Sequence, residues 1–476
     1  MKKLGLIGLT AIVFGSMIGS GLFNIVQNMA CGASAGAVIL SWVITAAGII
    51  FLVATFKILS DKRPDLNAGI YQYAQQGFGN YVGFNIAWGY WLCTAMGNVA
   101  YAVMFNDSWG VFFPTLLKHG WESFVFGFIL IVVMYLIVTN GIRSASFINT
   151  VITAFKLISI VLIIGILVIY FKIGLFTSDF WGGISLDTDI FTQIKHTMLV
   201  TLWCFLGIEG AVSMSARAKR SSDVGKAGIL GFLCAWVLYV LVSVLAFGVM
   251  TRQDMSGLEN PSVAYLLKDV CGEWAYYFVV CSIICSIGGG WVAWTLICAQ
   301  VPYEAAMVGI MPKQFMRLNR HDMPAYGLGL SSVVMVLFYL GVLMASSVYM
   351  AAIEVAGMMV LPAYLFCGLF LIKASMRGGQ GLRLKPGESS MPYMIIGAGC
   401  TLYCLWTIYA GGIDKLFVTS LLYLPGTFFY LMARKQNEAN GLIPFTKAEA
   451  GGFIVISLCA VISVYLISNG NVAFGG

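Results

Sequence analysis

Charged residues are scarce in this sequence. Aspartate, glutamate, lysine and arginine make up only 10% of the 476 residues, whereas hydrophobic residues make up 60%. Soluble domains carry about 25% charged residues, so this chain cannot build a water-facing surface along its whole length. The mean hydropathy of +0.89 points the same way. The composition therefore predicts a membrane protein in contact with the lipid bilayer.

The sequence also lacks the patterns of several functional classes. The three histidines, His119, His196 and His321, lie at or beyond the ends of the apolar stretches, so a nucleophile–histidine pair in the bilayer is unsupported and we expect no enzyme. No glycine-rich phosphate loop indicates ATP, and no charged ring or repeated filter indicates a channel. Cys281 and Cys285 share a helix face without a histidine, so we expect no metal site, and no cofactor is implied.

Apolar stretches of membrane-spanning length recur along the whole chain. About 20 apolar residues cross the hydrocarbon core as a helix. The first stretch continues to span length without a cleavage site, so no cleavable signal peptide is evident. The sequence predicts an all-α membrane protein with about 13 transmembrane helices, at 5–25, 33–59, 81–107, 121–139, 148–172, 191–215, 226–250, 274–306, 326–344, 350–374, 391–411, 415–433 and 451–468.

The basic residues predict how these spans are oriented. Of the 27 lysines and arginines, all but Lys156 and six others lie on the side of the N-terminus; the six are Lys118, Lys172, Lys195, Arg252, Lys268 and Lys415. Cytoplasmic loops collect positive charge, so we expect a bacterial inner-membrane protein with a cytoplasmic N-terminus and, after thirteen spans, an extracytoplasmic C-terminus. The net charge of +7 is thus a topology signal, and no nucleic-acid partner is expected.

Two predicted spans contain stretches that weaken a helix. The first span holds three glycines and two serines between Gly15 and Gly21, and the sixth holds Gly207, Glu209 and Gly210 in close succession. Non-helical backbone survives in a bilayer only where it is buried in protein or lines a polar cavity. Two interrupted helices, five spans apart, are typical of a transporter built from inverted repeats. Close helix packing is the alternative explanation of the glycines.

Several of these segments resemble one transporter family. The segment 15–23 looks like the first-helix motif of the amino acid–polyamine–organocation superfamily. The segments 203–211, 215–218, 223–227 and 88–93, with the stretch around Trp294 and Thr295, are similar to its basic amino acid/polyamine antiporters, and especially to the arginine/ornithine branch. The similarity extends through essentially the whole chain.

The resemblance implies a leucine-transporter-type fold with a five-plus-five inverted repeat, discontinuous helices 1 and 6, and alternating access. It divides the chain into a first repeat at 1–172, an extracytoplasmic connection at 173–190, a second repeat at 191–374 and additional C-terminal helices at 375–476.

Two acidic residues stand deep within predicted spans, where a charge usually marks a pathway or a relay. Glu209 lies in the sixth-helix break, where it would contact a substrate amine or exchange a proton; a protonated side chain bonded to loose backbone is the alternative. Glu354 lies in the tenth span, which in related exchangers faces the distal end of the substrate. The arginine/ornithine branch places its acid about one turn later, where this chain has Gly357, so the named substrate stays open.

Lys156 is the one basic residue well inside a span. It matches, by resemblance, the fifth-helix lysine that replaces a sodium ion in several family members. Its ammonium would bond first-helix carbonyls and dispense with sodium coupling. Partial snorkelling towards the interface is the alternative.

The remaining pocket residues follow from matching positions. The α-carboxylate of a substrate would sit on first-helix amides near Ser20 and Gly21, and its amine on carbonyls of the sixth-helix break. A distal cation would lie among Trp294, Asn98 and Glu354, because a ring face attracts a cation. The other candidates in the substrate site are Ser16, Ile18, Gly19, Cys93, Tyr101, Trp203, Cys204 and Gly207.

The sequence thus predicts a secondary antiporter that exchanges a cationic amino acid for its metabolic product, as in arginine/ornithine or histidine/histamine exchange. Small cationic amino acids and amines are the expected partners, and a homodimer is compatible with this interpretation. A proton-coupled amino acid symporter of the same fold is the alternative.

Overall fold

Long helices account for all thirteen predicted spans. The computed structural model describes residues 5–66, 69–141, 145–209, 221–344, 347–379, 381–438 and 446–469, and within these ranges it contains helices and no strands. This confirms the all-α prediction. The long helices are α1 (Leu6–Met17) with α2 (Gly21–Gly32), α3 (Ala35–Lys62), α5 (Asn80–Gly110), α6 (Trp121–Thr139), α7 (Ala145–Ile169), α9 (Ile190–Trp203), α11 (Ser221–Ala246), α14 (Glu273–Met307), α15 (Ala325–Val342), α16 (Val348–Gly379), α17 (Met391–Gly411), α18 (Ile413–Ser420) with α19 (Leu424–Glu438), and α20 (Lys447–Ser468).

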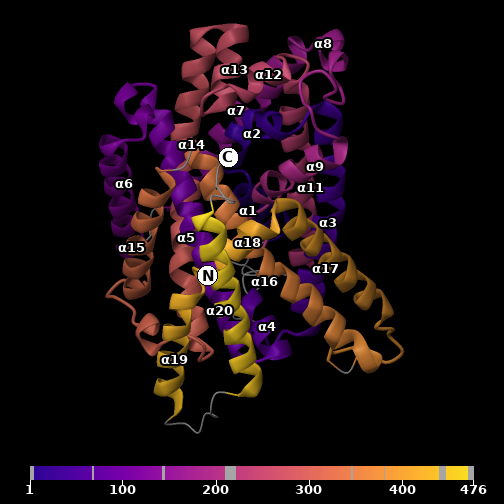
Figure 1. Ribbon diagram of the computed structural model, residues 1–476, viewed down its shortest axis with the longest axis vertical. Helices are drawn as coiled ribbons and strands as arrows, with labels where there is room; N and C mark the ends of the chain where they lie inside the picture. Colours follow the sequence, from indigo (N-terminus) through magenta and orange to yellow (C-terminus); the bar gives the residue numbers. More distant parts are fainter. Residues whose placement is uncertain are drawn as a thin grey trace.

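The long helices stand side by side in one bundle (Figure 1). α5 runs through it and packs against both α14 and α16. α4 and the connection between α16 and α17 lie at the lower end of the view, and α8, α12 and α13 at the upper end. The two ends therefore carry the loops that the charge distribution assigns to opposite sides of the membrane. Which end faces the cytoplasm stays a prediction.

Length and composition separate the spans into two groups. Among the described residues, eight helices are apolar and long enough to cross a membrane, or ten if each of two bent pairs counts as one span. The other three predicted spans correspond to α5, α7 and α9. α5 has 31 residues but includes several buried polar side chains, and α9 ends early at a break. α5 and α9 thus carry polar side chains that are buried inside the bundle.

Two of the predicted spans are each formed by a pair of helices that meet at an angle. α1 and α2 meet at 45°, as expected for a discontinuous first helix. The span expected at 415–433 is bent, because α18 and α19 meet at 47°. The long 274–306 stretch is one helix, α14, with Pro302 inside it.

Short helices fill the connections and were not expected from hydropathy, because they are too short to span a bilayer. They are α4 (Ile70–Phe78), η1 (Pro114–Lys118), α8 (Ile173–Ser178), α12 (Arg252–Ser256), α13 (Ser262–Cys271) and η3 (Lys313–Met316). α8 lies within the predicted connection at 173–190. The inverted repeat and the proposed domain boundaries stay predictions.

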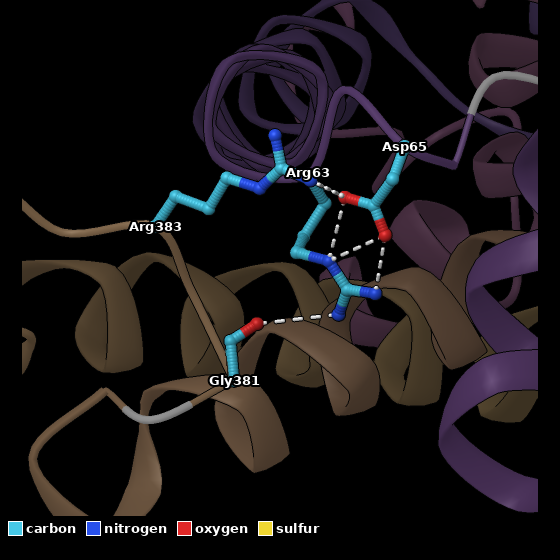
Figure 2. Close-up of polar contacts among 4 residues, drawn as sticks. All are labelled: Arg63, Asp65, Gly381 and Arg383. Atoms are coloured by element: carbon cyan, nitrogen blue, oxygen red, sulfur yellow. Dashed lines mark hydrogen bonds and ion pairs between the residues drawn. The ribbon is translucent and has the colours of Figure 1, made fainter.

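A polar cluster joins the end of α3 to the segment after α16 (Figure 2). The Arg63 guanidinium donates to both oxygens of Asp65 and, at 3.2 Å, to the carbonyl of Gly381. Arg383 approaches the same Asp65 carboxylate at 3.4 Å. The hydrogen bond from Arg63 lowers the pKa of Asp65, despite partial desolvation. This cluster ties together two connections that are more than 300 residues apart in the sequence.

Candidate functional site

The first-helix break exposes backbone carbonyls, and side chains from other helices bind them. α1 ends at Met17, and Ile18 has an extended backbone before α2 begins at Gly21. The Tyr239 hydroxyl of α11 donates to the Met17 carbonyl at 2.9 Å. The Lys156 ammonium of α7 donates to the Ile18 carbonyl at 2.5 Å, and only 5% of Lys156 is exposed. Buried backbone groups freed by the break are therefore satisfied by a tyrosine and a lysine.

The sixth-span break begins where α9 ends, at Trp203, and Cys204 caps the helix. Residues 204–209 form turns, and Gly207 has a φ of +101°, which residues with a side chain rarely adopt. The Glu209 carboxylate accepts a hydrogen bond from the Gly207 N–H at 3.2 Å. The later part of this motif, 210–220, lies outside the described residues. Glycine is thus required at position 207, where the backbone turns so that the Gly207 N–H faces the Glu209 carboxylate.

The two breaks contact each other. The Ser16 hydroxyl donates to the Gly207 carbonyl at 3.2 Å. A Cβ atom added at Gly207 would lie 3.2 Å from the Ser16 carbonyl oxygen, closer than side chains usually approach. The breaks therefore meet backbone to backbone, and a larger residue at 207 would force them apart.

A small cavity lies between these breaks. Seven of the predicted site residues line it: Ser16, Gly19, Ser20, Gly21, Tyr101, Trp203 and Trp294. Met17, Leu206 and Tyr239 complete the lining. The empty volume is about 220 Å³, including space that is open to the outside, and lining side chains such as Tyr101, Trp203 and Trp294 are buried. The site is therefore closely packed, and a substrate would enter only as its walls move.

Aromatic rings form one wall of the cavity. The Trp294 ring lies 6.2 Å from that of Trp203 and 6.3 Å from that of Tyr101, measured between centroids. A Cβ atom added at Gly19 would lie 2.4 Å from the Tyr101 hydroxyl oxygen, so this glycine admits the ring. The Trp294 indole N–H is buried and has no hydrogen-bond partner among the described residues. The wall therefore offers ring faces and one unused donor.

Glu209 is not among the residues that line the cavity, and uncharged donors hold its carboxylate. The Tyr90 hydroxyl of α5 donates to Oε1 at 2.7 Å, and the Tyr364 hydroxyl of α16 donates to Oε2 at 2.8 Å. Glu209 follows Leu206, which lines the cavity, by three residues. The carboxylate thereby links the sixth-span break to the third and tenth spans.

Four other predicted residues are buried without lining the cavity. The Asn98 side chain donates to the Thr94 carbonyl at 2.8 Å and accepts from the Thr295 hydroxyl at 2.7 Å. Cys93 and Cys204 are buried at 0% and 1% exposure. Ile18 contributes its carbonyl to Lys156, as described above. Asn98 is thus satisfied by protein groups in this arrangement.

Glu354 is placed apart from the aromatic wall. The Lys415 ammonium, from α18, lies 2.5 Å from its Oε1 atom. Glu354 is not among the residues that line the cavity described above. A distal substrate cation would have to compete with Lys415 for this carboxylate.

Sequence reasoning did not identify four tyrosines and a lysine that position these groups. They are Tyr90, Tyr239, Tyr349, Tyr364 and Lys415. Tyr90 stands inside a segment that resembles the transporter family, and Lys415 begins a predicted span, so each left a weak signal. Tyr239, Tyr349 and Tyr364 left none, because one tyrosine among 22 is unremarkable without knowledge of its contacts.

Comparison with known proteins gives consistent matches. Residues 4–432 match the amino acid permease family. The chain is 42% identical over 474 residues to the arginine/agmatine antiporter of Chlamydia felis, covering 98% of this chain and 97% of that one. It is 41% identical over 479 residues to that of Chlamydia pneumoniae, with coverage of 99% and 98%. For Chlamydia trachomatis serovar D the identity is 40%, with coverage of 98% and 96%.

Proposed function

This chain belongs to the amino acid permease family, and from that premise we propose that it exchanges a cationic amino acid for its amine product by alternating access. The family confirms the resemblance to the amino acid–polyamine–organocation superfamily, and the chain is a multi-pass membrane protein. The relatives are named arginine/agmatine antiporters, which favours amino acid/amine exchange over the arginine/ornithine pairing. They are named as transporters and not as enzymes.

The observation that carries this proposal is the contact between the two helix breaks beside a cavity. Ser16 and Gly207 bring the breaks together, and Lys156 and Glu209 bind backbone groups of the first and second break respectively. A substrate between the breaks would meet helix N-terminal N–H groups on one side and backbone carbonyls of the 204–209 turn on the other. This arrangement suits a zwitterionic amino acid group.

The substrate's groups are assigned as follows. The α-carboxylate binds Ser20 and the N-terminal amides of α2, which begins at Gly21. The α-amine binds carbonyls of the 204–209 turn. The side-chain cation lies against the rings of Trp203 and Trp294, where a cation gains about 0.5–2 kcal/mol depending on desolvation. An amine product keeps the second and third sets of contacts and loses the first.

Lys156 makes sodium unnecessary in this proposal. Its ammonium already binds the first-break carbonyl at Ile18, which is the kind of oxygen ligand that a sodium ion would use. We expect exchange by the wild-type protein to be unchanged when choline replaces sodium. Lys156→Met should reduce exchange at least tenfold, because the Ile18 carbonyl would lose its buried partner.

Counterflow in proteoliposomes tests the function directly. Liposomes containing the purified protein are loaded with unlabelled arginine, agmatine, ornithine, histidine or histamine, and labelled arginine or histidine is added outside. We expect uptake that depends on a loaded partner, strongest for an amino acid against its own amine. Failure of every pair contradicts the proposal.

The symporter alternative makes the opposite predictions. A proton-coupled symporter takes up its substrate without a loaded partner, and Glu354→Gln leaves its uptake of neutral amino acids intact. The names of the relatives do not favour this alternative. A cytoplasmic N-terminus, an extracytoplasmic C-terminus and a homodimer remain part of the proposal; labelling of single cysteines from either side would test the orientation.

A further inference from the structure

A short chain of hydrogen bonds ends at the first-helix break. The indole N–H of Trp203 donates to the Tyr349 hydroxyl oxygen at 3.1 Å. The Tyr349 hydroxyl donates to the Ser20 hydroxyl oxygen at 3.0 Å. All three side chains are buried, at 6%, 1% and 1% exposure. The chain thus connects the end of α9, the start of α16 and the gap between α1 and α2.

The direction of this chain follows from the indole and from the hydrogen-bond geometry. An indole N–H only donates, so Tyr349 must be the acceptor of the first bond. The geometry of the second bond makes the Tyr349 hydroxyl the donor and the Ser20 oxygen the acceptor. The Ser20 oxygen is thereby used as an acceptor, and its own proton is directed elsewhere.

The Ser20 proton has no acceptor in the described part of the protein. Ser20 precedes α2, yet its side chain makes no capping hydrogen bond to that helix. Its residue lines the cavity, together with Gly21 at the helix N-terminus and Trp294, whose buried indole N–H also lacks a partner. The Ser20 hydroxyl and the N–H groups at the N-terminus of α2 are therefore donors, and donors suit an anionic acceptor with two oxygens.

We propose that Tyr349 determines specificity for the carboxylated substrate, because its hydroxyl orients the Ser20 O–H towards the α-carboxylate. This inference rests on the proposed amino acid/amine exchange. An amine product has no carboxylate and cannot use the oriented donor. Tyr349 is thus a positioning residue that acts through Ser20, and it favours the amino acid over its amine on the same pathway.

Tyr349→Phe in the full-length protein tests this proposal. The substitution removes the hydroxyl and keeps the ring, so the Ser20 hydroxyl loses the donor that holds it. In counterflow with arginine and agmatine we expect the KM of arginine to rise about tenfold, equivalent to about 1.4 kcal/mol. The KM of agmatine should change less than twofold. If the wild type carries histidine and histamine instead, the same ratio is measured with that pair.

Three further variants distinguish the orientation of Ser20 from a general structural effect of the substitution. Ser20→Ala removes the far end of the chain and should cause the same selective loss. In that background, adding Tyr349→Phe should cause no further change, since coupled residues give non-additive effects. Tyr339→Phe is the matched control, because it also removes a buried tyrosine hydroxyl, one that donates to the Ser123 carbonyl at 3.0 Å between α15 and α6. Its amino acid/amine ratio should match the wild type.

The possible results distinguish this inference from the proposed function. Equal changes in the KM of both substrates, or additive effects of the two substitutions, overturn the role of Tyr349 while leaving the exchange function intact. A wild-type protein that exchanges no amino acid/amine pair overturns the proposed function, and the inference falls with it. A selective, non-additive loss of the amino acid supports both.

Discussion

Glu209 and Glu354 are two buried acids that both lie deep within predicted spans but bind different kinds of partner in the structure. Their exposure is nearly the same, at 8% and 6%. The described donors to Glu209 are two tyrosine hydroxyls and a backbone N–H. Glu354 instead lies 2.5 Å from the ammonium of Lys415. Burial therefore does not separate the two acids, whereas the charge of their partners does.

The difference bears on which acid responds to a substrate. Hydroxyl and amide donors stabilise a carboxylate without cancelling its charge, so Glu209 keeps an electrostatic attraction for a nearby amine or proton. Lys415 supplies a full positive charge to Glu354, and a cationic substrate would meet a pair that is already balanced. We therefore expect transport to depend on Glu209 much more than on Glu354.

The largest expected effect is that of Glu209→Gln. The amide keeps the shape of the side chain and can still bond Tyr90 and Tyr364, because a tyrosine hydroxyl both donates and accepts. It loses the negative charge. We expect amino acid/amine exchange to fall at least about a hundredfold, equivalent to about 2.7 kcal/mol, with little change in melting temperature. Counterflow and a thermal-shift assay measure the two quantities.

The matched control for this prediction is the double variant Glu354→Gln/Lys415→Met, which removes the other acid with its counter-charge. Exchange in this variant should remain within about threefold of the wild type. If it loses exchange as severely as Glu209→Gln does, Glu354 contacts the substrate and the two acids are functionally alike.

A second prediction concerns stability at the Glu354–Lys415 pair. Lys415→Met alone leaves a buried carboxylate without its ammonium, and removing one partner of a buried pair costs about 3–5 kcal/mol. Lys415 is 17% exposed, so we expect a smaller cost of about 2 kcal/mol. The double variant should recover most of the loss, as denaturant or thermal unfolding would show. A double variant less stable than either single variant would argue against direct pairing.

The smallest effect is expected at an acid outside the bilayer, Glu388. Lys62 lies 2.6 Å from its carboxylate. The pKa of Glu388 falls to about 2, first through the Lys385 backbone N–H and then through Lys62. Because this pKa is below the ordinary value of about 4.3, the contribution to stability is present above about pH 5 and declines as the pH falls towards 2.

Glu388→Gln tests this pH dependence of the stability. The melting temperature should drop slightly at pH 7, and the difference from the wild type should shrink at pH 4 and below. A difference that grows on acidification would contradict the assignment. Solvent screening keeps this effect below that of the buried Glu354–Lys415 pair.

The sequence predicted the positions of the helices better than their shapes. Hydropathy located α6 at 121–139 and α17 at 391–411 with the observed ends, because uniformly apolar helices begin and end where polarity returns. The bend between α18 and α19 was not predicted, although Pro425 and Gly426 stand directly after it and are the residue types that most often interrupt a helix. Glycine and serine around 15–21 did reveal the first break, because each weakens a helix locally.

The residues that line the cavity could be predicted from the sequence better than the side chains that hold the buried polar groups in place. Seven predicted residues line the cavity, and the lysine expected to bind a first-helix carbonyl lies on Ile18. The tyrosines that bind Glu209 and Ser20 could not be predicted, because their positions depend on how α5 and α16 pack and rotate.

By itself, the sequence determined that this chain crosses a membrane many times, where two of its helices break, and which charges lie within the bilayer. Those properties follow from local composition, since hydrocarbon excludes charge and glycine weakens a helix. Only the tertiary structure decided what each charge binds. Tyr364 is 155 residues from Glu209, and Lys415 is 61 residues from Glu354. Such partners are set by helix packing, because a side chain can bind only what its neighbouring helix places beside it.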